Sequence, residues 1–206
     1  MQPDRRAQPG YLEAFARIAA KIAARLKDVD PKQLPIRLVV AGGAALHLHT
    51  GSRVSVDVDG VFSRRVVIDD DLEASYRDVD GRARVLYFDR NYNDTLGLMH
   101  EDSQDDAERI DLPGVDGKVL EVRVLTPLDL AVSKLSRFSD QDRADIELLA
   151  REKRIDAKSL KKRAEEALGG YVGDVASVLT TIDLACRIVE AAIPASPATR
   201  STPPAE

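Results

Sequence analysis

The sequence predicts a mixed α/β protein, of the α/β or α+β class, in which helices flank a mixed sheet and a helical bundle forms the C-terminal part. Two observations carry this prediction. Short segments rich in β-branched residues fall between residues 36 and 125, whereas apolar residues at helical spacing occupy the chain before and after them. Sheet segments set between helices are typical of a layered domain, and the helical second half is expected to pack beside it.

The first expected element is an amphipathic helix over residues 11–26, because Phe15, Ile18 and Ile22 recur on one helix face. Residues 1–9 before it are polar and include two prolines, and residues 194–206 are rich in Pro, Ser, Thr and Ala. Such segments bury too little apolar surface to fold, so we expect disorder at both ends. The expected strands are residues 36–41, 57–62, 66–68, 85–88 and 119–125, with a helix up to about His49 between the first two.

Four helices are expected after the last strand, at residues 127–138, 140–151, 157–168 and 172–192. Thr126 and Ser139 can each cap the helix that follows. An acid lies three residues after each of them, where a capping box places it. Residues 10–150 are therefore expected to form the main domain, and residues 151–193 a C-terminal helical region.

Composition narrows the function classes. The 206-residue chain carries a net charge of −5, so it has no global attraction to nucleic acid or to an anionic membrane. Cys186 is the only cysteine and lies in an apolar helical pattern, which excludes an internal disulfide and predicts a core position. No apolar run has the length of a membrane span and the N-terminus lacks a signal-peptide core, so a cytoplasmic protein with no membrane partner is expected.

The strongest chemical signal is a strand that opens into Gly42 and Gly43 at the start of a helix, followed by a second strand that carries Asp57 and Asp59. Glycines let the backbone approach a phosphate, and the first amides of a helix attract anions. Residues two apart on a strand point to the same face, so the two aspartates project side by side. The pattern predicts a nucleotide phosphate site next to a carboxylate pair. The alternative is an ordinary turn beside a solvated strand face.

Two adjacent carboxylates repel each other unless a cation lies between them, and hard oxygen ligands suit Mg²⁺ or Mn²⁺. Asp57 and Asp59 are therefore the candidate metal ligands. The identity of a third carboxylate ligand is left open between Asp89, at the end of a strand, Glu121, within a strand, and Asp145.

Two charged residues of the helical half also stand out. Lys134 has Leu130 four residues before it and Phe138 four residues after it, a setting that suits either a snorkelling lysine or a cation held beside phosphates. Asp145 lies along the inward edge of its helix, and a carboxylate there needs a partner such as Lys134 or Arg143, a metal or a catalytic proton. Asp142, in contrast, is explained by helix capping.

These pieces together resemble the nucleotidyltransferase-fold superfamily, most of all its toxin-like branch related to AbiEii abortive-infection proteins and MenT toxins. The resemblance covers about residues 38–149 and rests on four motifs, at residues 42–43, 57–59, 130–135 and 142–146. It implies a nucleotidyltransferase-like sheet with these site residues: Asp57 and Asp59 bind metal, Gly42, Gly43 and Lys134 contact the nucleotide, and Asp145 assists catalysis.

The resemblance also implies a reaction. A nucleoside monophosphate would move from an NTP to an acceptor, pyrophosphate would be released, and Mg²⁺ or Mn²⁺ would be the cofactor. In the related toxins the acceptor is the 3′ end of tRNA, and a cognate antitoxin protein would be a partner. Two alternatives stay open: a non-catalytic module of this fold that binds a nucleotide or a partner, and a small-molecule nucleotidyltransferase of the aminoglycoside type.

Charge clusters bear on the acceptor. Seven basic residues crowd a short helical region, which suits either RNA phosphates or a solvated helix face. The acidic segment 101–108 fits no motif. Its residues 101–106 could attract a cationic substrate, and an exposed acidic loop explains them as well. The three histidines lack metal-ligand spacing and are expected to be structural. The basic residues are Arg151, Lys153, Arg154, Lys158, Lys161, Lys162 and Arg163.

Overall fold

The computed structural model describes residues 6–67, 72–92 and 97–193, and its centre is a six-stranded sheet. The strands are β1 (Ile36–Val40), β2 (Asp57–Phe62), β3 (Glu73–Arg77), β4 (Ala83–Asp89), β5 (Glu108–Ile110) and β6 (Leu120–Val124). They lie in the order β3-β4-β2-β1-β6-β5. β1 runs parallel to β6 and β2 runs parallel to β4, while the other neighbours are antiparallel. The sheet is therefore mixed, as the sequence predicts.

Helix α1 (Pro9–Arg25) packs on this sheet against β3, β4 and β6. The apolar stripe predicted from its spacing is buried, with Tyr11, Phe15, Ile18 and Ile22 at 2% exposure or less. Burial of one large apolar side chain contributes about 1.5–3 kcal/mol. Four such side chains on one face fix the helix to the sheet.

The helical half consists of α4 (Pro127–Ser133), α5 (Asp140–Arg151), α6 (Ala157–Ala167) and α7 (Val175–Ala192). Each of these helices follows a side chain that accepts a hydrogen bond from the backbone N–H three residues on, which satisfies a donor that the helix itself leaves open. Helix α7 packs on α5 and α6 and closes the bundle. The capping residues are Thr126, Ser139, Asp156 and Asp174, in chain order.

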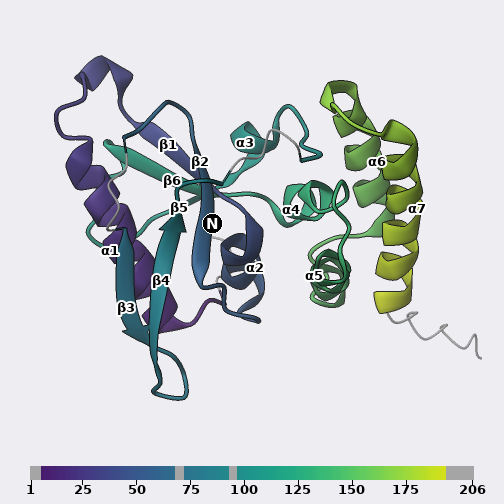
Figure 1. Cartoon of the computed structure of the whole chain (residues 1–206), viewed down its shortest axis with the longest axis horizontal. Coiled ribbons are helices and arrows are strands. Elements are labelled where there is room, and N and C mark those ends of the chain that lie inside the picture. Colours follow the sequence, from purple (N-terminus) through teal and green to yellow (C-terminus); the bar gives the residue numbers. More distant parts are fainter. Residues whose placement is uncertain (1–5, 68–71, 93–96, 194–206) are drawn as a thin grey trace, which may run out of the picture.

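Helix α2 (Gly42–Thr50) joins the two halves. Figure 1 shows the sheet with α1 on one side of the molecule and α4 to α7 on the other, with α2 between them. Helix α2 contacts β2 on the sheet side, and α4 and α5 on the helical side. All of its residues from 44 to 50 are buried. Short elements elsewhere are α3 (Ser103–Asp106), η1 (Pro31–Gln33) and η2 (Leu168–Gly170).

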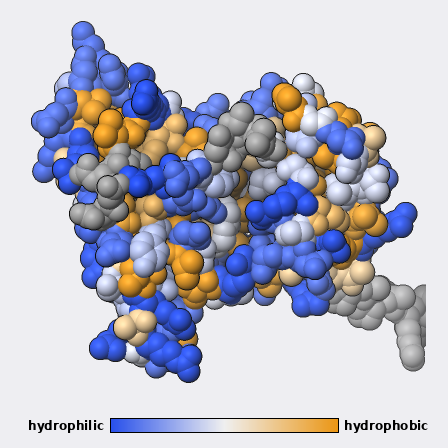
Figure 2. All heavy atoms as spheres, in the orientation of Figure 1, coloured by the Kyte–Doolittle hydropathy of each residue, from blue (hydrophilic) through white to orange (hydrophobic). Residues whose placement is uncertain are grey.

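The surface is largely hydrophilic on the face drawn in Figure 2, with hydrophobic side chains exposed in patches over both halves. Among the described helices, none combines the length and the apolar content that a membrane span requires. Cys186 lies buried on α7, as the sequence predicts, and its thiol is 3.6 Å from the carbonyl oxygen of Ala157.

Two helix boundaries and one strand prediction are wrong. The helix expected over residues 127–138 ends at Ser133, because the chain turns through residues 134–137 and Phe138 takes a φ of 46°. Residues 66 and 67 form no strand, since Val67 is 83% exposed and its branched side chain has no sheet face to pack on, and residue 68 lies outside the described residues. The last helix begins at Val175 rather than at residue 172, because Asp174 caps it.

The sequence does not predict β3 or β5. β3 pairs with β4 and buries only Ala74 and Tyr76, and the three residues of β5 pair with β6, so tertiary pairing outweighs weak local preference. At the N-terminus α1 already begins at Pro9, inside the segment for which we expected disorder. Residues 1–5 and 194–206 lie outside the described residues.

Candidate functional site

The turn between β1 and α2 brings the backbone against a carboxylate. Gly42 has a φ of +56°, and a Cβ there would lie 1.7 Å from Asp59 Oδ2. A Cβ on Gly43 would lie 2.7 Å from Ser55 Oγ, the hydroxyl that donates to Asp57 Oδ1 at 2.6 Å. Glycine therefore permits both side chains to pack onto the first turn of α2. The residue before α2 offers no side-chain cap, so the first amides of the helix remain open to an anion.

Three carboxylates gather on β2 and β4. Asp57 and Asp59 share one face of β2, and Asp59 is the register partner of Asp89 on the parallel strand β4. Neighbouring strands lie about 4.8 Å apart, so the side chains of these two partners are neighbours as well. Burial, followed by the charges of Asp57 and Asp89, raises the pKa of Asp59 to about 6, although Lys134 and Arg137 act to lower it. Burial is thus the main cause of the raised pKa of Asp59, and repulsion from the two neighbouring carboxylates adds to it.

Among the three acids considered as a third ligand, Asp89 is the one that lies in this cluster. Its Oδ1 accepts the backbone N–H of Asn91 at 2.8 Å. Glu121 is engaged elsewhere, because its Oε1 accepts from Arg123 Nε at 2.5 Å and lies 3.8 Å from Arg37 Nε. The third acid is held by the cations described next.

Lys134 is buried, with 7% of its side chain exposed, so the snorkelling alternative is wrong. Its Nζ donates to Asp145 Oδ2 at 2.8 Å and lies 3.6 Å from Asp142 Oδ1. Asp145 also accepts from Arg53 Nη2 at 3.0 Å and from Gln141 Nε2 at 2.9 Å. With both of its oxygens engaged, Asp145 fixes the ammonium at the edge of the site.

Asp142 forms a capping box with Ser139, as predicted, and it also accepts two hydrogen bonds from Arg137, at 2.8 and 2.7 Å. Burial acts to raise the pKa of Asp142, but the hydrogen bonds from Arg137 and Ser139 hold that pKa well below its usual range. The side chain of Arg137 is 73% exposed, and its positive charge acts to lower the pKa of Asp59. The sequence does not identify Arg137 as a site residue, because it predicts a continuous helix over residues 127–138. In the structure this helix ends at Ser133, and the turn that follows places Arg137 at the pocket.

A pocket of about 350 Å³ lies between the two halves of the molecule. Gly42 and Asp59 line it from the sheet side, and Lys134, Arg137 and Asp142 line it from the helical side. The pocket thus has two carboxylates and two cations, and Asp142 is already bound by Arg137. Asp59 and the cations can bind a divalent metal ion together with the phosphate oxygens that share it. The other lining residues are Tyr92, Gly97, Met99, Ser133 and Ser136.

The donors beside this pocket fit Mg²⁺ or Mn²⁺. Within the described residues, no three His, Cys, Asp or Glu side chains already converge on one ligand position. Mg²⁺ does not require such a cage, because it binds through one or two carboxylates and keeps waters and substrate phosphates as its other ligands. Asp57 and Asp59 meet that requirement, and a cation there would offset the carboxylate repulsion that, after burial, raises the pKa of Asp59.

The predicted basic cluster of the helical region does not form an open patch. Arg163 Nε lies 2.8 Å from Asp129 and its Nη2 2.6 Å from Asp106, while Lys161 Nζ lies 3.0 Å from Asp183. Acids from other elements thus pair with Arg163 and Lys161, and Lys153 and Lys158 remain exposed. Further partners are Glu147 for Arg151, Glu166 for Lys162 and the His49 carbonyl oxygen for Arg154.

The acidic segment 101–108 forms ion pairs with both the sheet and the helical half. Asp105 binds Arg37 at 2.6 Å, and Asp106 binds Arg163. The histidines bind backbone groups, as expected of structural residues. Nδ1 of His47 lies 2.5 Å from the Ser52 carbonyl oxygen, Nε2 of His49 lies 2.7 Å from that of Leu125, and His100 Nδ1 accepts from the Asp102 amide at 3.1 Å.

Residues 18–175 match the model of a protein family described as "Nucleotidyltransferase of unknown function (DUF6036)". The match includes both walls of the pocket, from the turn at Gly42 to the helix that carries Asp145. No curated protein and no solved structure matched the chain.

Proposed function

The chain belongs to the DUF6036 family of nucleotidyltransferases, and from this premise we propose that it moves a nucleoside monophosphate from an NTP to an acceptor hydroxyl. The observation that carries the proposal is the shared pocket of Gly42, Asp59, Lys134 and Arg137. A triphosphate needs both kinds of group found there, cations for its oxygens and carboxylates for the metal that accompanies it.

In this proposal the first amides of α2 and the two cations bind the triphosphate. Lys134 Nζ has three donors, of which one is given to Asp145, so the others can reach phosphate oxygens. Asp57 and Asp59 would hold Mg²⁺ or Mn²⁺, with Asp89 as the third carboxylate. Such a metal, when bound, polarises the α-phosphate and stabilises the departing pyrophosphate.

The acceptor hydroxyl oxygen then bonds to the α-phosphorus, and the bond from that phosphorus to the bridging oxygen of the β-phosphate breaks. Pyrophosphate leaves with the electron pair of the broken bond, and the hydroxyl proton passes by way of Asp89 to solvent. Lys134 and Arg137 offset the charge that builds on the leaving group. Asp145 acts as a positioning residue for Lys134 rather than as the base, because both of its oxygens already accept hydrogen bonds.

We further propose that the chain belongs to the toxin-like branch related to AbiEii proteins and MenT toxins, with the 3′ end of tRNA as acceptor and an antitoxin protein as partner. The order along the chain of Gly42, the Asp57 and Asp59 pair, Lys134 and Asp145 supports this branch. Two acids of the segment 101–108, Asp105 and Asp106, are engaged in ion pairs, which weakens the aminoglycoside alternative.

A pyrophosphate-release assay tests the reaction class. Purified protein is incubated with each NTP, Mg²⁺ and total RNA, and pyrophosphate is converted to phosphate by an added pyrophosphatase and measured. Asp57→Asn and Asp59→Asn are matched variants that keep the side-chain shape and remove the charge. We expect release by the wild type and none by either variant. Binding of an NTP without release, in the presence of RNA, protein and small-molecule fractions of a lysate, would instead identify the non-catalytic module.

A further inference from the structure

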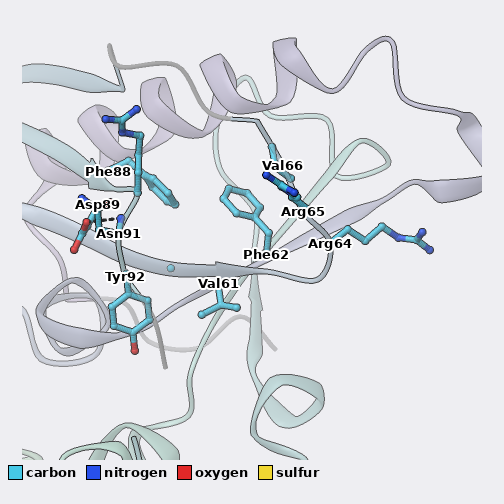
Figure 3. A pocket seen from close by; sticks show the side chains of 11 residues that line it. Val61, Phe62, Arg64, Arg65, Val66, Phe88, Asp89, Asn91 and Tyr92 are labelled. Atoms are coloured by element: carbon cyan, nitrogen blue, oxygen red, sulfur yellow. Dashed lines mark hydrogen bonds between the residues drawn. The ribbon is translucent and has the colours of Figure 1, made fainter. Parts of the chain in front are cut away.

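A second groove, of about 510 Å³, adjoins the carboxylate cluster at the end of β4. β4 pairs with β2 only as far as Asp59 and Asp89, and residues 60–62 of β2 continue beyond that point. The groove lies beside this extension (Figure 3). Asp89 lines the groove, Asp59 lines the nucleotide pocket, and Tyr92 lines both. The two cavities therefore share Tyr92, and each is lined by one of the register partners Asp59 and Asp89.

Arginines dominate the charge of this groove. Arg64, Arg65 and Arg90 line it, with Asp89 as the single acid among its lining residues. Arg64 and Arg65 are exposed, and neither has an ion pair or a side-chain hydrogen bond with any residue that the structure describes. They differ in this from most of the basic residues of the helical region, which have acidic partners. A guanidinium group whose donors are open binds phosphate oxygens well, because its fork matches their geometry.

Aromatic rings supply the apolar part of the groove. Phe62 and Phe88 lie with their ring centroids 5.6 Å apart, and Figure 3 shows Phe62 between Asp89 at one end of the groove and the two arginines at the other. Phe88 is buried at 6% exposure and supports Phe62, which is half-buried and leaves part of its ring open to a base. Cations that can hold phosphates, next to a ring on which a base can stack, are the combination that single-stranded nucleic acids use in protein grooves.

We propose that this groove is the acceptor site of the transfer reaction and that Arg64 and Arg65 bind the phosphate groups of the acceptor. The inference rests on the proposed function, because a transferase needs a second substrate whose hydroxyl reaches the carboxylates from outside the donor pocket. A strand held by its phosphates at the two arginines has its terminal hydroxyl directed to Asp89. The same arginines repel a cationic acceptor.

Phosphate groups are shared by an oligonucleotide end and by a mononucleotide, and two neighbouring arginines favour the first, because they can contact successive phosphates. The test measures the binding of a fluorescein-labelled single-stranded RNA 12-mer by anisotropy, over a series of salt concentrations, with AMP as the competing mononucleotide. The variant is Arg64→Gln/Arg65→Gln. The matched control is Lys153→Gln/Lys158→Gln, which removes the same charge from the two exposed lysines of the helical region.

We expect the arginine variant to bind the 12-mer at least about tenfold more weakly, and the slope of log affinity against log salt to fall by about 1.4, since each single-strand phosphate contact contributes about 0.7. The lysine variant should bind as the wild type does. Competition by AMP at the affinity of the 12-mer would assign the groove to a mononucleotide. Equal binding by the arginine variant and the wild type, or a loss in the lysine variant alone, would overturn the proposal.

Binding of an NTP with Mg²⁺ is measured in parallel on the same proteins and on Asp59→Asn. We expect the arginine variant to keep this binding, because neither arginine lines the nucleotide pocket. A wild type that fails to bind any NTP would overturn the proposed function, whereas a failure at the groove leaves NTP binding intact. The two failures are therefore distinguishable.

Discussion

The buried ion network beside the nucleotide pocket predicts an asymmetry between two substitutions. Lys134→Met removes the ammonium 2.8 Å from Asp145, but that carboxylate keeps Arg53 at 3.0 Å and Gln141 at 2.9 Å. A hydrogen bond to a charged group is worth about 1.5–3 kcal/mol. We therefore expect Lys134→Met to lower the free energy of unfolding by about 2 kcal/mol and to abolish nucleotidyl transfer.

Asp145→Asn removes the carboxylate charge that pairs with Lys134, and we expect it to lower the free energy of unfolding more than Lys134→Met does. The ammonium of Lys134 is left with Asp142 at 3.6 Å, and Asp142 already binds Arg137 through two hydrogen bonds. A buried charge that loses its partner costs about 3–5 kcal/mol. We expect a loss near the lower end of that range, because the second carboxylate remains close.

Urea unfolding followed by circular dichroism at pH 7 measures both losses, together with that of the double variant. The double variant should lose less than the sum of the single variants, because Lys134→Met removes the charge that Asp145→Asn strands. Single losses below about 0.5 kcal/mol, the value typical of surface substitutions, would refute the buried network. Additive losses would refute the pairing within it.

Three further predictions concern the carboxylates. The pKa of Asp59 is about 6 in the folded chain against an ordinary 3.8, so as pH rises Asp59 ionises first in the unfolded chain, and the folded state loses stability between these two pH values. Asp59→Asn should therefore raise the urea midpoint of unfolding at pH 7.5 but not at pH 3.5, and a midpoint unchanged at both pH values would contradict this. Gly42→Ala places a Cβ 1.7 Å from Asp59 Oδ2 and should abolish transfer. The control Gly81→Ala, at a φ of +76° with nothing within 4 Å of its Cβ, should lower the free energy of unfolding by about 1–2 kcal/mol and keep activity. Equal activities of the two variants would contradict the packing of Asp59 on the first turn of α2. Ser55→Ala removes the 2.6 Å hydrogen bond to Asp57 and should raise the Mg²⁺ concentration needed for half-maximal rate, which a metal titration of the rate checks.

Local patterns in the sequence are enough to predict most of the framework. The glycine turn at Gly42, the paired aspartates of β2 and the caps at Thr126 and Ser139 each depend on residues a few positions apart, and the structure has them as predicted. Most helix boundaries follow from the same signals. The exceptions are the turn after Ser133, the start of α7 at Val175 and the start of α1 at Pro9.

The remaining site features depend on contacts between distant segments. Asp89 joins the cluster through the register of β4 on β2, and Arg53 reaches Asp145 across 92 positions of the chain. In the basic cluster, local sequence instead predicts a feature that the structure does not have. Its local composition predicts an open cationic face, but Asp129 and Asp183 come from other helices and neutralise it. Charges within one window of sequence do not reveal the partners that folding supplies.

Transfer of label from an NTP carrying ³²P at the α-phosphate tests the central claim most directly. Wild-type protein and Asp59→Asn are incubated side by side with Mg²⁺, each labelled NTP and total RNA, and the products are separated by size. We predict label on an acceptor with the wild type, none with the variant, and none when the ³²P is at the γ-phosphate. Equal labelling by the two proteins, or transfer of the γ-label instead, would contradict nucleotidyl transfer at this carboxylate cluster.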